Sequence, residues 1–241
     1  MNDMRYQNHL SLENFNEKTQ TKISASTVSI FGLGGLGSVC SLYLSNAGIG
    51  TLNLVDYDSV DETNLPRQII YKPNQVGMNK AVAAKTTLLE FNPKTKLNDY
   101  NQRLIGKDLQ MLINKSTIVI DATDNLASRL QINAACHTEK CLHIVGTAIR
   151  YDGQVMTFDH TDKSNACLQC LYQNNDENIE DCEGAGVLST VAGVVGLLMA
   201  NSAIKAIIGI KHQNEMLAID CKHNDFRNIR LQKSLKCSIC S

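Results

Sequence analysis

The chain has 241 residues, of which 43% are hydrophobic and 20% are charged, so general disorder is excluded and one large domain or two small ones can form a core. Lysine and arginine (23) nearly balance aspartate and glutamate (24), and only 5% of the residues are aromatic. This balance gives no sign of binding to nucleic acid or to an anionic membrane. The first residues are polar and show no basic-then-apolar leader, so we expect a cytoplasmic protein.

The first part of the chain predicts an arm followed by a βαβ unit. Residues 1–24 are polar and amphipathic, and we expect a single domain over residues 25–241. An apolar run at Thr27–Phe31 leads into the sequence GLGGLG, a predicted helix at 38–47 and a second β-rich run at Thr51–Val55. Asp56 follows at once. Strand, glycine loop, helix, strand and acid in this order are typical of a βαβ unit.

The alternation of strands and helices continues along the chain. We expect a helix at 79–91, a strand at 117–121, a helix at 127–136 and strands at 142–146 and 154–158. The predicted fold class is therefore α/β, a Rossmann-like, doubly wound and mainly parallel sheet with antiparallel strands added late.

Residues 187–204 form an uncharged, largely apolar stretch whose length is near the lower limit for a membrane span. Polar side chains such as Ser189 and Asn201 interrupt its apolar surface, and Gly193 and Gly196 allow close packing. We therefore expect a buried helix, possible also at a subunit interface, and no membrane partner.

The glycine sequence predicts a phosphate site. Gly32, Gly34, Gly35 and Gly37 place backbone N–H groups at a helix N-terminus, where phosphates bind. Asp56 ends the next strand, where a carboxylate can accept hydrogen bonds from ribose hydroxyls. Both a dinucleotide such as NAD and ATP fit this arrangement.

The residues that follow Asp56 favour ATP over NAD. The candidate nucleotide-binding residues after it are Asp58, Asn64, Arg67, Gln68, Lys80, Asp124 and Asn125. A hydride-transfer site needs few charges near the nicotinamide, whereas Arg67 and Lys80 can hold a triphosphate and Asp124 can hold Mg²⁺. Spacing alone also allows Arg67 and Lys80 to be ordinary surface cations.

Nine cysteines are an odd number, and four of them form two CxxC pairs, Cys167/Cys170 and Cys237/Cys240. Four thiolates complete a tetrahedral Zn²⁺ site, so the predicted zinc would be a structural staple and not a catalytic metal. A redox pair or unrelated cysteines are the alternatives. Cys182 lies between acidic residues before a predicted helix and is either a free surface cysteine or a reactive thiol.

Together these motifs resemble the ubiquitin-activating-like family of bacterial adenylyltransferases, the ThiF, MoeB and HesA proteins, over essentially the whole chain. The matching segments are Arg5-Tyr6, the GLGGLG sequence, Asn64-Leu-Pro-Arg67-Gln68, Lys80, Thr123-Asp-Asn125, Glu180-Asp-Cys182, Gly186-Val187 and both CxxC pairs. The resemblance implies binding of ATP, Mg²⁺ and Zn²⁺. It also implies that the C-terminal Gly-Gly carboxylate of a small ubiquitin-like sulfur carrier attacks the α-phosphorus and releases pyrophosphate.

The resemblance also implies residue roles and partners. Gly35 would lie against the phosphates and Asp56 would bind the ribose. Arg67, Lys80, Asp124 and Cys182 would be the catalytic residues, with Asp124 on Mg²⁺ and Cys182 able to link covalently to the carrier. The family forms homodimers and works with a sulfurtransferase. We lean to a ThiS-type carrier of thiamine synthesis, with the small subunit of molybdopterin synthase, a peptide substrate or a non-catalytic scaffold as alternatives.

One position departs from the family pattern. The family usually opens with Arg-Tyr-x-Arg-Gln, and its second arginine reaches the ATP phosphates of the neighbouring subunit. Here Asn8 takes that place and cannot supply the charge. We expect that Arg5, Lys18 or Lys22 in the same arm replaces it, or that the activity is weakened or altered.

Overall fold

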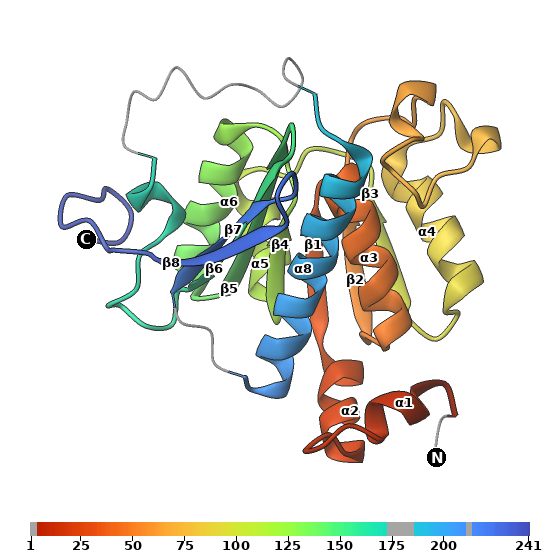
Figure 1. Ribbon diagram of the computed structural model, residues 1–241, viewed down its shortest axis with the longest axis horizontal. Coiled ribbons are helices and arrows are strands. Elements are labelled where there is room, and N and C mark those ends of the chain that lie inside the picture. The colour runs from red at the N-terminus through yellow and green to blue at the C-terminus, as the bar shows by residue number, and fades with distance from the viewer. Residues whose placement is uncertain (1–3, 173–185, 211–213) are drawn as a thin grey trace.

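The computed structural model describes residues 4–172, 186–210 and 214–241 (Figure 1). Within these residues eight strands form one sheet, in the order β3-β2-β1-β4-β5-β6-β7-β8. The strands are β1 (Thr27–Phe31), β2 (Thr51–Val55), β3 (Lys96–Tyr100), β4 (Ile118–Asp121), β5 (Leu142–Ile149), β6 (Asp152–Asp159), β7 (Glu215–Asp220) and β8 (Asp225–Arg230). The first five strands pair in parallel and the last three are added antiparallel, which confirms the predicted fold class.

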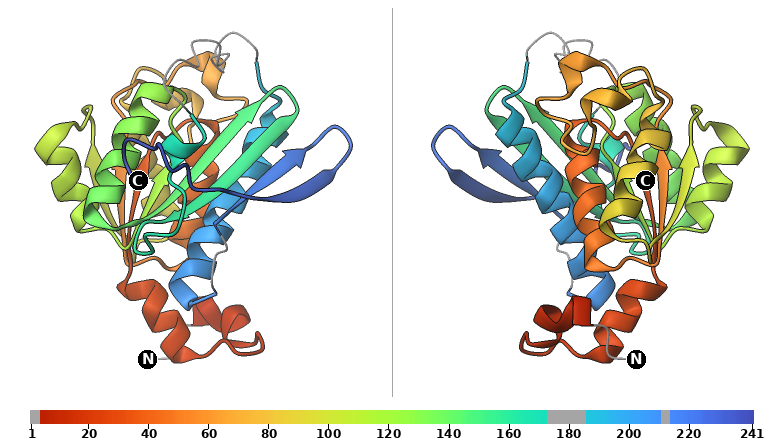
Figure 2. Two further views of the ribbon diagram at one scale, coloured as in Figure 1. Left: turned by 90° about the vertical axis from the view of Figure 1, so that its left-hand side faces the viewer. Right: turned by 90° about the vertical axis from the view of Figure 1, so that its right-hand side faces the viewer.

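Helices cover both faces of the parallel half of the sheet (Figures 1 and 2). The α-helices are α1 (Gln7–Leu10), α2 (Glu17–Ala25), α3 (Gly35–Ala47), α4 (Lys80–Phe91), α5 (Gly106–Asn114), α6 (Leu126–Glu139) and α8 (Ser189–Ile208). Short 3₁₀ turns are η1 (Met4–Tyr6), η2 (Glu62–Asn64), η3 (Pro73–Gln75) and η4 (Leu168–Cys170). One apolar core lies between the sheet and α3, α4 and α8, and a second lies between the sheet and α5 and α6.

The central strands are apolar along their whole length because both of their faces are buried. In β4, Ile118 and Ile120 belong to one core and Val119 to the other, as the two-residue period of a strand requires. The expected strands β1 and β2 begin and end where the sequence places them. The expected helix at 38–47 begins three residues earlier, at Gly35, and the expected strand at 142–146 continues to Ile149.

The uncharged stretch forms α8, which packs beside α3 and against β5 and β6 (Figure 1). Gly196 brings the two helices together, since a Cβ on it would lie 2.4 Å from the backbone oxygen of Leu36. Only 39% of the most apolar part of α8 is buried, so the prediction of a buried helix holds for one side of it. Among the described residues α8 is the one helix long and apolar enough to cross a membrane, a test that core helices also pass.

The N-terminal residues pack on the end of the sheet away from the glycine loop (Figure 2). Asn16 caps α2 by accepting a hydrogen bond from Thr19 N at 3.1 Å. Ile23 is fully buried, and the hydroxyl of Tyr6 accepts a hydrogen bond from Asn92 Nδ2 at 3.2 Å. Helix α2 ends at Ala25, two residues before β1, so the predicted arm runs directly into the sheet.

Candidate functional site

A cavity of about 550 Å³ lies at the carboxyl ends of β1, β2 and β4. From β1 the chain runs outward to β2 and β3 on one side, then crosses back to β4 and β5 on the other side of β1. Ligands bind at such topological switch points. The cavity is lined by these predicted residues: Gly32, Gly34, Gly35, Asp56, Asp58, Asn64, Arg67, Gln68, Lys80, Asp124 and Asn125. The structure therefore brings together residues that are up to about a hundred positions apart in the sequence.

Gly37 does not line the cavity and packs beneath the glycine loop. A Cβ on Gly37 would lie 1.9 Å from the carbonyl oxygen of Gly32, and Gly32 itself has a φ of +83°. These contacts require glycine, because a side chain at either position would clash or be strained. Gly37 thus shapes the loop from below, whereas the prediction placed it among the nucleotide-binding residues.

The glycine loop is held by Asp56, which follows β2, by Tyr71 and by α8. Leu33 N donates to Asp56 Oδ2 at 2.7 Å, and the buried hydroxyl of Tyr71 donates to Leu33 O at 2.9 Å. A Cβ on Gly35 would lie 2.9 Å from the Cβ of Ala192 on α8. The backbone at the start of α3 is therefore close-packed behind and open toward the cavity, as a phosphate cradle must be.

Asp56 is buried at the end of β2 with both carboxylate oxygens engaged. Its Oδ1 accepts a hydrogen bond from Asp58 N at 2.9 Å, in addition to the bond from Leu33. Burial raises the pKa of Asp56, while these backbone hydrogen bonds and the charge of Lys80 oppose the rise. Each oxygen keeps a further lone pair that could accept a hydrogen bond from a ribose hydroxyl.

Two cations stand on the same side of the cavity. The buried Lys80, at the first position of α4, donates to Asp58 Oδ2 at 3.2 Å, and Arg67 Nη1 donates to Thr63 O at 3.1 Å. Gln68 is buried beside the glycine loop, and its Oε1 has no hydrogen-bond partner among the described residues. Two positive charges and a glycine cradle form a set that suits a polyphosphate.

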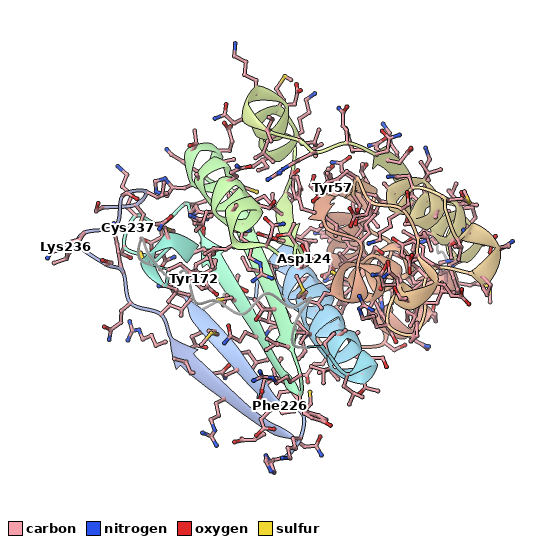
Figure 3. The ribbon with its side chains drawn as sticks, turned by 90° about the horizontal axis from the view of Figure 1, so that it is seen from above. Tyr57, Asp124, Tyr172, Phe226, Lys236 and Cys237 are labelled. Atoms are coloured by element: carbon pink, nitrogen blue, oxygen red, sulfur yellow. The ribbon has the colours of Figure 1, made fainter. Side chains whose placement is uncertain are left out.

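The loop between β4 and α6 forms the other side. Asp124 is exposed there, and Asn125 caps α6 by accepting a hydrogen bond from Ser128 N at 2.9 Å. Arg129 is buried and donates through Nε to Thr123 O at 3.0 Å. Figure 3 shows Asp124 near Tyr57, which follows β2. Asn125 Nδ2 donates a hydrogen bond to Asp124 Oδ1 at 3.4 Å. An exposed carboxylate on a well-anchored loop, in the same cavity as the two cations, is suited to holding a divalent metal ion on a phosphate chain.

Sequence reasoning missed other residues of the same cavity, among them Tyr57, Arg103 and Arg129. Arg103 follows β3 and its Nη2 lies 3.4 Å from Ser128 Oγ on α6. Its position after a strand was the only available signal, and that strand is too polar to stand out as β-structure. Arg129 is part of an ordinary helical pattern, so nothing in the sequence marks it.

The four cysteines of the two CxxC pairs meet in one cluster, with all four Sγ atoms within 4.8 Å of one another. Cys167 and Cys237 are 3.6 Å apart at sulfur, and Cys170 and Cys240 are 3.4 Å apart. Tetrahedral zinc with Zn–S bonds of 2.3 Å needs sulfurs about 3.8 Å apart, so the cluster fits a Zn²⁺ ion. Figure 3 places Cys237 far from Asp124, as expected for a structural metal. Cys182 lies outside the described residues.

The whole chain matches one protein family: residues 6–239 fit the ThiF family. This protein belongs to the ThiF family. It is 36% identical over 244 residues to the sulfur carrier protein ThiS adenylyltransferase of Escherichia coli strain K12, covering 100% of this chain and 97% of that protein. It is also 36% identical over 239 residues to the molybdopterin-synthase adenylyltransferase of the same strain, covering 98% and 96%.

A longer relative and a solved structure extend the comparison. The ThiF-family chain is 34% identical to the adenylyltransferase and sulfurtransferase MOCS3 of Culex quinquefasciatus, covering 98% of this chain and 55% of that protein. The fold matches a crystal structure of E. coli MccB with a TM-score of 0.84 at 23% identity, over 100% of this chain and 75% of that one. This protein is thus an enzyme of the adenylyltransferase type, which favours ATP over the dinucleotide alternative.

Proposed function

We propose that this protein adenylates the C-terminal Gly-Gly carboxylate of a small ubiquitin-like sulfur carrier of the ThiS type, with release of pyrophosphate. One observation carries the proposal. A single cavity holds the glycine cradle, Arg67 and Lys80 on one side and the exposed carboxylate of Asp124 on the other, in a chain 36% identical over its length to a ThiS adenylyltransferase.

The reaction needs positioning more than acid–base chemistry. An oxygen of the carrier carboxylate, already ionised at neutral pH, attacks the α-phosphorus of ATP. The bond from that phosphorus to the bridging oxygen breaks, and the electron pair leaves with pyrophosphate. No protein base is required, because no proton is removed. The protein has to align two anions and offset their charge.

The residues of the cavity divide this work. The amides at the start of α3, with Gly35, would hold phosphate oxygens, and Asp56 would orient the ribose. Arg67 and Lys80 would neutralise charge on the phosphates, with Asn64 and Gln68 as hydrogen-bonding partners. Mg²⁺ held by Asp124 would supply two further positive charges, about four in all against ATP⁴⁻. Asn125 and Arg129 keep the Asp124 loop in place.

We also propose a cytoplasmic homodimer that hands its product to a sulfurtransferase. Helix α8 leaves part of its apolar surface uncovered in the single chain, as at the exposed Leu197.

The cations of the N-terminal elements, Arg5, Lys18 and Lys22, lie at the end of the sheet away from the glycine loop (Figure 2). Any of them that contacts a nucleotide would therefore have to do so in another subunit. Covalent linkage of Cys182 to the carrier stays a part of the proposal.

The small subunit of molybdopterin synthase is the second candidate substrate. The observation in its favour is that the chain is as similar to the molybdopterin-synthase adenylyltransferase of E. coli as to the ThiS adenylyltransferase, at 36% identity in both comparisons.

The deciding experiment measures pyrophosphate release from ATP and Mg²⁺ by the purified protein with each carrier in turn. We expect release only with a carrier that ends in Gly-Gly and none with the same carrier lacking its last two residues. Preference for the ThiS-type carrier supports the thiamine branch, and preference for the molybdopterin-synthase subunit selects the other. ATP binding without release on any carrier would overturn sulfur-carrier adenylation and leave the peptide or scaffold alternatives.

A further inference from the structure

A buried carboxylate–imidazole pair lies directly beneath the loop that carries Asp124. Asp121 is the last residue of β4 and His143 is the second residue of β5, and both side chains are fully buried. His143 Nε2 lies 3.6 Å from Asp121 Oδ2. Neither atom has a hydrogen-bond partner among the described residues.

The other oxygen of Asp121 builds the loop itself. Oδ1 accepts hydrogen bonds from Thr123 N at 3.0 Å and from Thr123 Oγ1 at 2.7 Å. The carbonyl of Thr123 in turn accepts from Arg129 Nε at 3.0 Å. Thr123 therefore makes hydrogen bonds through three of its atoms, and two of these bonds depend on the orientation of the Asp121 carboxylate. Asp124 is the next residue.

The surroundings keep this carboxylate charged. Burial alone raises the pKa of Asp121, but His143, Arg129 and Thr123 more than offset it, so the pKa lies below its usual value. His160 stacks on His143 with ring centroids 6.0 Å apart, and its Nε2 has no hydrogen-bond partner within the described part of the chain. Burial and its histidine neighbours lower the pKa of His160 to about 3, so His160 is neutral.

We propose that His143 is a positioning residue of the nucleotide site, which fixes the Asp121 carboxylate and through it Thr123 and the metal-binding carboxylate of Asp124. The inference rests on the proposed function in assigning Mg²⁺ to Asp124. His143 belongs to none of the motifs that mark the family, and it is not among the residues that line the cavity. A residue of this kind acts as the outer partners of metal ligands do, where substitution lowers metal affinity or activity about 10- to 100-fold.

The test compares variants of two histidines in one cluster. His143→Phe removes the imidazole next to Asp121 but keeps an aromatic ring. His160→Phe makes the same replacement at the stacked neighbour and serves as the matched control. We expect His143→Phe to raise the Mg²⁺ concentration for half-maximal pyrophosphate release about tenfold, with the KM for the carrier unchanged. We expect His160→Phe to behave as the unaltered protein in this assay, even if both variants unfold at a lower temperature.

Two further variants separate positioning from packing. His143→Gln keeps an N–H donor near the place of Nε2 and should restore most of the Mg²⁺ dependence. His143→Asn is small enough to fold but too short to reach Asp121, so it should behave as His143→Phe. Equal Mg²⁺ dependence of His143→Phe and His160→Phe, or equal impairment of His143→Gln and His143→Asn, would overturn the proposal.

A second measurement does not depend on catalysis. Backbone hydrogen–deuterium exchange over residues 121–129 should be faster in His143→Phe than in His160→Phe, because the ties to Thr123 weaken. If the unaltered protein releases no pyrophosphate with any carrier, the proposed function fails while this measurement still decides the role of His143. Unchanged exchange in His143→Phe would refute the positioning role.

Discussion

The two ends of the sheet are stabilised in different ways. The parallel strands β3, β2, β1, β4 and β5 are packed between helices, with β1, β2 and β4 almost wholly buried. The antiparallel strands β7 and β8 are only partly covered, and β8 is mostly exposed. At that end the four clustered cysteines join the chain before α8 to the C-terminal residues. The parallel half is thus held by burial of apolar surface and carries the cavity, whereas the antiparallel half lies beside four clustered thiols that can hold a zinc ion.

Removing charge from the cavity should lower the activity carried by the parallel half without lowering the stability of the fold. Arg67→Ala and Asp124→Ala should each lower the rate of carrier adenylation at least about a hundredfold, because each takes away charge that offsets the phosphates. The fold should survive, since Asp124 is exposed and Arg67 is only half-buried. Pyrophosphate exchange and thermal unfolding measure the two effects.

Arg227→Ala is the matched control for this pair. Arg227 is an exposed arginine on β8 that pairs with Asp225, at the other end of the sheet. Its removal should leave the exchange rate unchanged. Retained exchange in Asp124→Ala would contradict its assignment as the Mg²⁺ ligand.

Removing the metal from the cysteine cluster should lower the stability of the protein. Chelation of zinc, or Cys237→Ser, should lower the free energy of unfolding by at least about 3 kcal/mol, or roughly 6–12 °C in Tm. Differential scanning calorimetry with metal analysis measures this. Cys221→Ser is the control, because Cys221 is half-buried and lies outside the cluster. Loss of stability in Cys221→Ser alone, or none on chelation, would rule out the staple.

Helix α8 lies between the two halves of the sheet, and two of its glycines test how it packs on α3. A Cβ on Gly196 would lie 2.4 Å from Leu36 O, whereas one on Gly193 would meet nothing within 4 Å. Gly196→Ala should therefore cost about 1–3 kcal/mol of unfolding free energy, and Gly193→Ala should stabilise by up to about 1 kcal/mol. Urea denaturation measures both. Similar values for the two variants would mean that α8 does not pack on α3 as described.

The smallest expected effect concerns the turn after β7. Asp220 Oδ2 lies 2.8 Å from His223 Nδ1. This hydrogen bond and the negative charge of Asp220 raise the pKa of His223. A raised pKa in the folded protein contributes stability below the ordinary pKa of about 6.5, and the contribution is lost as the pH rises through the folded value. Both groups are exposed, so the change in stability should be slight. NMR titration should show the raised pKa and its return toward the ordinary value in Asp220→Asn.

The same contrast explains how much could be predicted from the sequence. β1 and β2 were predicted to the residue because buried parallel strands are continuous apolar runs bounded by polar residues. β3, with the sequence KLNDY, was missed because it is a polar edge strand, and β7 and β8 were missed because β7 is only partly buried and β8 is mostly exposed. Burial on both faces leaves a strong pattern, and burial on one face or none leaves a weak one.

The candidate site divides in the same way. The glycine loop, Asp56 and the four-cysteine cluster were predictable because chemistry dictates their residue types and spacing. Arg103 and the Asp121–His143 pair were not, because they depend on which strands are neighbours and in what register. The pairing of β4 with β5 sets Val119 opposite His143, and no local pattern encodes that alignment.

A metal ion bound by the four cysteines would also change the topology of the chain. Cys170 and Cys237 enclose α8, β7 and β8, so an ion bound to all four thiolates closes that part of the backbone into a ring. A single cut inside the ring would not separate the C-terminal piece, which would stay attached to the rest of the protein through metal–sulfur bonds. After such a cut, helix α8 would still be linked to the metal site through its uncut end until the zinc is withdrawn.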